Sequence, residues 1–152
     1  MTINSQILIS SQIDDFDLAD ERLAELKKLI KIILDRELEE AEEHPDCLEV
    51  SLTFVDDDRI EKLNKEYRDR QKPTDVLAFP LGEELLGEVI ISIPRARDQA
   101  EDYNHSLFYE ISFLTVHGVL HLLGYEHGDF ETRSDMEERE KSYLSELDFF
   151  SD

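Results

Sequence analysis

Three of the five histidines stand close together in the segment HGVLHLLGYEH, and imidazole nitrogen is a common metal ligand. His117 and His121 are four residues apart, so on a helix their side chains project from one face, one turn apart. Gly124 follows three residues later, where a glycine in the left-handed conformation ends a helix and reverses the chain. His127 could then return to the same ion. We therefore predict a metal site with His117, His121 and His127 as its ligands.

The predicted site has the composition of a catalytic zinc centre. Three protein ligands leave the fourth tetrahedral position open, whereas closed structural sites recruit four side chains and usually cysteine. This chain has one cysteine, Cys47. We expect one Zn²⁺ ion per chain. Ni²⁺ and copper bind nitrogen ligands at least comparably, so affinity does not select the metal, and the choice of zinc rests on tetrahedral geometry and availability. The remaining histidines, His44 and His105, are expected to be structural.

The elements that must position these histidines predict a single α+β domain over residues 1–152, with a small mixed sheet of about four strands and helices packed on it. Alternating apolar residues predict four strands, the first an edge strand and the last two paired, at 3–9, 47–55, 75–79 and 86–93. Apolar residues at helical spacing predict five helices. The first begins at a cap on Asp17 or Asp20 and ends near residue 43, and the second begins at Asp56 or Asp57 and passes through 67. The last three run from 94 to about 103, from between 104 and 106 through 123, and from 132 or 134 through 147. The metal-site helix is the fourth, in the C-terminal half.

Charge and composition limit the partners. Sixteen Lys and Arg against 38 Asp and Glu give a formal charge of −22, which repels polyanions and argues against non-specific nucleic-acid binding. Residues 62–72 differ, with five bases against two acids, so a local basic patch is predicted there. We expect no membrane span and no targeting segment. The single cysteine fits a reducing cytoplasm.

With these motifs in view, the chain resembles the YbeY family. The family pattern HGxLHLxGYDH is matched at 117–127 with Glu126 in place of aspartate, and the pattern LNxxYRxxxxPTDVLSFP is similar to residues Leu63–Pro80, with Ala78 in place of serine. The strand entry LLGEV at 85–89 also matches, so the resemblance covers about residues 47–145. The first forty-odd residues carry none of it.

The resemblance implies a zincin-like fold, a metal held by His117, His121 and His127, and a functional arginine, Arg68. It also implies a single-strand-specific endoribonuclease that acts in 16S rRNA 3′-end maturation and ribosome quality control. The expected partners are then single-stranded RNA or rRNA and the ribosome or its proteins, and no DNA. The chemistry agrees at Arg68, because a guanidinium can stabilise the charge that develops on phosphate oxygens during phosphodiester cleavage.

Two further expectations concern residues near the histidines. Asp75 and Glu126 are carboxylates that could orient a ligating imidazole through its other nitrogen, although each could equally be a cap or a surface charge. Tyr125 is expected to pack near the site rather than act as a base, because the ordinary pKa of tyrosine lies near 10.

Two alternative functions remain open from the sequence. The histidine spacing equals that of the metzincin proteases, HExxHxxGxxH, which favours a metallopeptidase or amidase. Gly118, however, stands where those enzymes carry their general-base glutamate. The other alternative is a non-catalytic ribosome-assembly factor, in which the metal only holds the helix and the following loop together.

Overall fold

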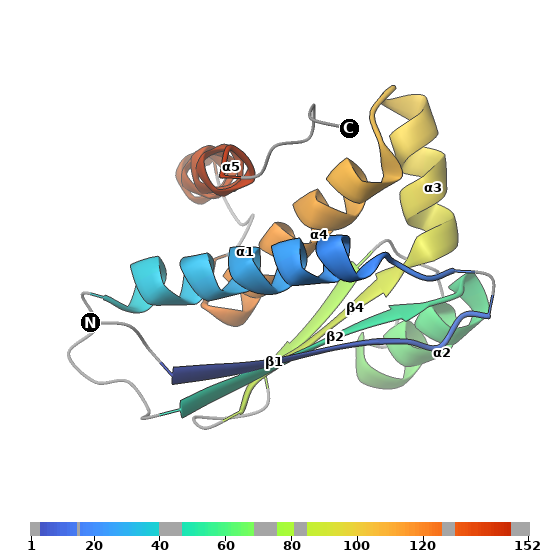
Figure 1. The fold of residues 1–152 in the computed structure, drawn as a ribbon, viewed down its shortest axis with the longest axis horizontal. Helices are drawn as coiled ribbons and strands as arrows, with labels where there is room; N and C mark the ends of the chain where they lie inside the picture. The colour runs from blue at the N-terminus through green and yellow to red at the C-terminus, as the bar shows by residue number, and fades with distance from the viewer. Residues whose placement is uncertain are drawn as a thin grey trace.

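The computed structural model describes residues 4–14, 16–39, 47–68, 76–80, 85–125 and 130–146. These residues form the predicted α+β fold, in which a mixed four-stranded sheet is packed with helices (Figure 1). The strands are β1 Asn4–Ser11, β2 Cys47–Val55, β3 Val76–Pro80 and β4 Leu85–Ser92. The helices are α1 Asp20–Leu38, α2 Asp57–Arg68, α3 Ile93–Asp102, α4 Leu107–Leu122 and α5 Phe130–Leu144. None of the helices in these ranges is long and apolar enough to cross a membrane.

The strand order in the sheet is β1-β2-β4-β3. The first three strands of this order run parallel, and β3 pairs antiparallel with β4. The predicted pairing of the last two strands is therefore confirmed, as is the position of the first strand at an edge of the sheet.

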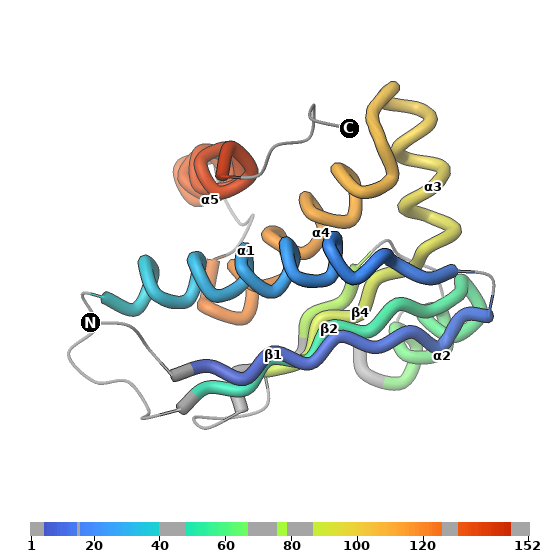
Figure 2. Tube along the Cα trace, in the orientation of Figure 1, coloured from blue at the N-terminus to red at the C-terminus, as the bar shows by residue number. Residues whose placement is uncertain are grey.

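Helices cover both faces of the sheet. The larger core lies between the sheet and the layer of α1 and α4, where alternating residues of β2 point toward these helices: Leu48, Val50, Leu52 and Phe54. A smaller core on the opposite face joins α2 to the sheet through Val55, Ile60, Leu63, Leu77 and Ile90. α5 packs on the outside of α1 and α4, away from the sheet (Figure 2).

Local capping explains where most helices begin. Asp56 caps α2, because its Oδ1 accepts a hydrogen bond from the Arg59 N–H at 2.8 Å. Ser106 caps α4 in the same way, accepting from the Tyr109 N–H at 3.0 Å. Both starts were predicted. The predicted cap of the first helix was wrong: Ala19 occupies that position without a side-chain hydrogen bond, and Asp20 already lies in the first turn, where its charge favours the helix dipole.

Several helix boundaries differ slightly from the prediction, among them the end of α5, which is Leu144 rather than residue 147. α1 ends at Leu38 rather than near residue 43, and residues 40–46, with His44, lie outside the described ranges. α3 begins at Ile93, after a cap by Ser92, and α5 begins at Phe130 rather than at 132 or 134. Terminal turns shift in this way because periodicity fixes the middle of a helix better than its ends.

Candidate metal centre

α4 carries the first two predicted ligands through the centre of the molecule. It contacts β3, β4, α1, α3 and α5, and most of its side chains are buried. A helix enclosed on so many sides is held by packing rather than by its own propensity. The two histidines it carries are thus fixed to a rigid element.

The C-terminal end of α4 is a Schellman motif. Gly124 adopts a φ of +104°, and its N–H donates to the carbonyl of His121 at 3.0 Å. The N–H of Tyr125 donates to the carbonyl of Leu120, also at 3.0 Å. These two bonds define the motif, and the predicted role of Gly124 is confirmed. The turn directs the chain into the segment that carries His127.

Gly118 has a packing role that the sequence did not reveal. A Cβ atom on this residue would lie 2.6 Å from Cγ1 of Val89, far inside van der Waals contact. The missing side chain therefore lets α4 lie directly against β4. A glutamate at this position would be driven into the sheet, so the metzincin alternative loses geometric support as well as its base.

His117 and His121 come together on one face of α4, as predicted. Their Nε2 atoms lie 3.0 Å apart, with the rings at 74°. Two imidazoles on one tetrahedral zinc ion, each at about 2.1 Å from it, hold their nitrogens roughly 3.4 Å apart. The observed separation is close to that value, so the two side chains fit a shared ion with only a small adjustment.

A buried carboxylate orients His117. Glu140, on α5, is 3% exposed, and its Oε1 lies 3.3 Å from His117 Nδ1. When the carboxylate accepts a hydrogen bond from the Nδ1–H group, the lone pair of the imidazole is on Nε2, the nitrogen that faces His121. Asp75 and Glu126, predicted for such a role, lie outside the described residues.

Sequence analysis missed Glu140 because no motif surrounds it. The available signal was its position on an apolar helix face: Glu140 lies at helical spacing from Met136, Tyr143 and Leu144, which are all buried. A glutamate on the apolar face of an amphipathic helix requires a partner, and that pattern could have singled it out.

The structure does not describe the third predicted ligand, and it describes the predicted arginine only through its backbone. His127 lies in the segment 126–129, outside the described residues. Among residues 4–125 and 130–146, with their gaps, no group of three metal-ligating side chains occurs. Arg68 ends α2, on the face of the sheet opposite α4 (Figure 1), and its side chain is not among those described. Its predicted role beside the metal stays a prediction.

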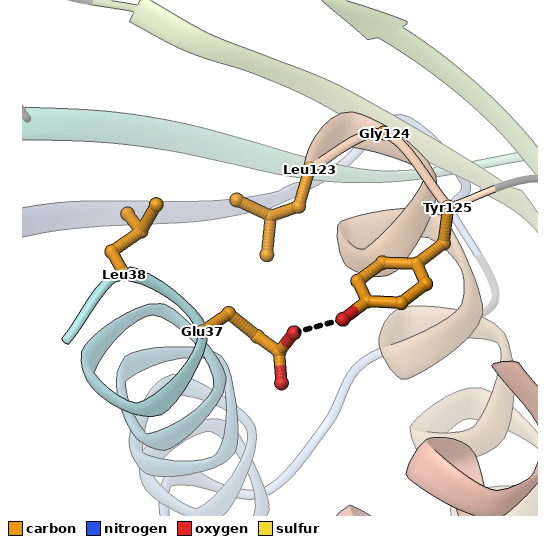
Figure 3. Close-up of a pocket in the computed structure, with 5 residues that line it drawn as sticks. All are labelled: Glu37, Leu38, Leu123, Gly124 and Tyr125. Atoms are coloured by element: carbon orange, nitrogen blue, oxygen red, sulfur yellow. Dashed lines mark hydrogen bonds between the residues drawn. The ribbon is translucent and has the colours of Figure 1, made fainter. Parts of the chain in front are cut away.

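A second buried carboxylate, Glu37 of α1, lies next to the end of α4 (Figure 3). It accepts hydrogen bonds from the Tyr125 hydroxyl at 2.5 Å, from Arg139 Nη1 at 2.9 Å, and from the Tyr143 hydroxyl. Burial, and then this carboxylate, raise the pKa of Tyr125 to about 12. Tyr125 therefore remains a neutral donor near pH 7 and not a base, as the sequence indicated.

Glu37, Tyr125 and their neighbours Leu38, Leu123 and Gly124 also line a hollow of about 230 Å³. Sequence reasoning missed Glu37 too. The residue continues the buried stripe of α1, which includes Ile30, Ile33 and Leu34, so a carboxylate on an apolar face was again the available signal.

His105 is held by a structural contact. Its Nε2 atom lies 2.6 Å from Oε2 of Glu110, which is 3% exposed. Its ring packs against the rings of Tyr103 and Tyr109. These contacts are of the structural kind that the sequence predicted for His105.

Comparison with known proteins identifies the family. The family model described as "Endoribonuclease YbeY" matches residues 11–148. A protein of that name from Finegoldia magna is 43% identical over 152 residues, covering 96% of each chain. Another from Bacillus cereus is 41% identical over 150 residues, covering 90% of this chain and 96% of its own.

A solved structure has the same fold. The solution structure of a Thermotoga maritima protein superposes with a TM-score of 0.64 at 29% identity, covering 93% of this chain and 88% of that one. The family model covers nearly the whole chain, including the helix with His117 and His121, and the structural match covers a similar share. The chain belongs to the YbeY family of endoribonucleases.

Proposed function

We propose that this chain is a single-strand-specific endoribonuclease that binds one divalent ion, zinc, through His117, His121 and His127. The observation that carries the proposal is the 3.0 Å separation of the His117 and His121 Nε2 atoms, on a helix whose end is fixed by Gly124. Membership of the family supports the reaction class.

The residues of the chain prepare the site for that chemistry. Glu140 accepts a hydrogen bond from the Nδ1–H group of His117 and so keeps the proton on Nδ1, and the Nε2 lone pair then points to the position between the two rings. Three neutral imidazoles would leave the full charge of the ion in place, and a bound Zn²⁺ supplies Lewis-acid polarisation of a phosphoryl oxygen and a water of lowered pKa. Arg68 is the proposed contact to the non-bridging phosphate oxygens, which a guanidinium can bind at two points.

The proposed substrate is rRNA, in 16S rRNA 3′-end maturation and ribosome quality control, in the cytoplasm. The charge of −22 opposes long-range attraction of free RNA. A ribosome or ribosomal protein that presents the RNA would overcome this repulsion. Two exposed lysines of α2, Lys62 and Lys65, belong to the net-basic segment 62–72 and offer a small area of favourable contact to RNA phosphates.

The test compares the wild type with His121→Ala on a single-stranded RNA. We expect cleavage by the zinc-loaded wild type and none by the variant, with an unchanged melting temperature of the metal-free protein. His44→Ala is the matched histidine control and should retain zinc and activity. If His121→Ala cuts RNA like the wild type, the metal does not take part in the reaction. A wild type that binds zinc but cuts no RNA, alone or on ribosomes, would favour the assembly-factor alternative.

A further inference from the structure

We propose that Glu37 is a positioning residue for the metal centre, and this inference rests on the proposed zinc site. Glu37 lies near the C-terminal end of α1, far from the histidines in the sequence. Its carboxylate joins the two segments that flank the site, the turn after α4 and the helix α5. Through them it would set the position of the end of α4, which carries His121, and the orientation of His117.

The first arm runs through Tyr125 to the end of α4, which carries His121. The Tyr125 hydroxyl donates to Glu37 Oε1 (Figure 3), and the guanidinium of Arg139 lies 5.1 Å from the centre of the Tyr125 ring. The N–H of Tyr125 also donates to the Leu120 carbonyl at 3.0 Å. Holding the ring and the hydroxyl of Tyr125 therefore fixes the turn that ends α4, and with it the last turn of the helix, which carries His121.

The second arm runs through α5 to His117. Arg139 and Tyr143 both donate to Glu37 Oε2. Glu140, between them in the sequence, contacts His117 Nδ1. Fixing the two donors fixes the rotation and height of this part of α5, and with it the carboxylate that orients the imidazole.

Glu37 is not needed merely to attach α1 to the protein. Five apolar residues of this helix are completely buried and anchor it to the core: Leu26, Leu29, Ile30, Ile33 and Leu34. The Glu37 side chain is 7% exposed, and a carboxylate so buried is retained only where donors compensate it. Here all three donors come from the segments around the histidines, which indicates a role in that site.

The test measures zinc affinity by competition with a chelator, in the full-length protein. Glu37→Gln keeps the size of the side chain but turns an amide group toward donors. We expect zinc affinity to fall at least tenfold, the scale seen when supporting groups around a metal are changed. Glu25→Gln is the matched control, because Glu25 is on the same helix and pairs at the surface with Arg22 at 3.0 Å. It should change affinity less than twofold.

Two further measurements keep the result interpretable. The melting temperature and circular dichroism of the metal-free variants report folding separately. If Glu37→Gln does not fold, Tyr125→Phe removes only one hydroxyl and should lower zinc affinity at least threefold by itself. Wild-type affinity in a folded Glu37→Gln, or in Tyr125→Phe when the first variant is unfolded, would overturn the inference and leave the proposed function standing. Failure of the proposed function would give a different result: zinc binding by the wild type would not depend on His121.

Discussion

Replacing Gly118 with alanine tests how closely α4 packs against the sheet. The new Cβ would lie 2.6 Å from Cγ1 and 3.1 Å from Cγ2 of Val89, whereas carbon atoms in favourable contact are about 3.5 to 4.0 Å apart. Either Val89 or the helix must move by close to an ångström. Overpacking of this kind costs about 1 to 3 kcal/mol, and the better helix propensity of alanine offsets about 1 kcal/mol.

We therefore expect Gly118→Ala to be destabilised by up to about 2 kcal/mol, which lowers the melting temperature by several degrees in a chain of this length. The measurement is denaturant unfolding of the metal-free protein. Val89→Ala removes both atoms of the clash, so the double variant should show a favourable coupling of about 1 kcal/mol or more in a double-mutant cycle.

The double-mutant cycle also has an outcome that would refute the described packing of α4 against β4. If the effects of Gly118→Ala and Val89→Ala are simply additive, the two positions do not press on each other and α4 lies farther from β4 than described. A shift of α4 would also move His117 and His121. Zinc affinity should therefore fall in Gly118→Ala and recover in the double variant.

Three other changes have defined outcomes. Glu140→Gln should weaken zinc binding about 10- to 100-fold, because His117 loses the acceptor that fixes its tautomer; chelator competition measures it, and an unchanged affinity would remove Glu140 from the site. Gly124→Ala should cost about 1 to 2 kcal/mol in unfolding experiments, because alanine resists the positive φ of this residue, and equal stability would argue against the turn described. Arg68→Ala should slow RNA cleavage at least tenfold, about 1.4 kcal/mol, at unchanged zinc content, and Arg68→Lys should recover part of the rate; Arg22→Ala is the control, and activity equal to wild type in Arg68→Ala would return this arginine to an ordinary surface role.

The parts of the fold that could be predicted from the sequence are those with local causes. Ser106 and Asp56 predict helix starts because a cap acts over only three residues. Gly124 predicts the end of α4 because only glycine adopts its φ without strain. The spacing of His117 and His121 is likewise a property of one helix, so the approach of their nitrogens followed directly from the sequence.

The parts that could not be predicted depend on tertiary packing. Glu37 meets Tyr125 and Tyr143 across 88 and 106 residues, and no pattern near Glu37 specifies those partners. Gly118 was interpreted only as the absence of a base, because its true constraint is the position of Val89 on another element. The N-terminal helix, which the family resemblance left without a role, thus contributes a carboxylate beside the site.

The most direct test of the central claim is calorimetric titration of zinc into metal-free wild type and His127→Ala, with single-stranded RNA cleavage measured on the same samples. We predict one zinc ion per wild-type chain, RNA cleavage that rises with zinc occupancy, and a sharp loss of both in His127→Ala. If His127→Ala binds zinc with wild-type stoichiometry and affinity, the third ligand is misassigned. If cleavage does not follow zinc occupancy, the metal-dependent mechanism is wrong.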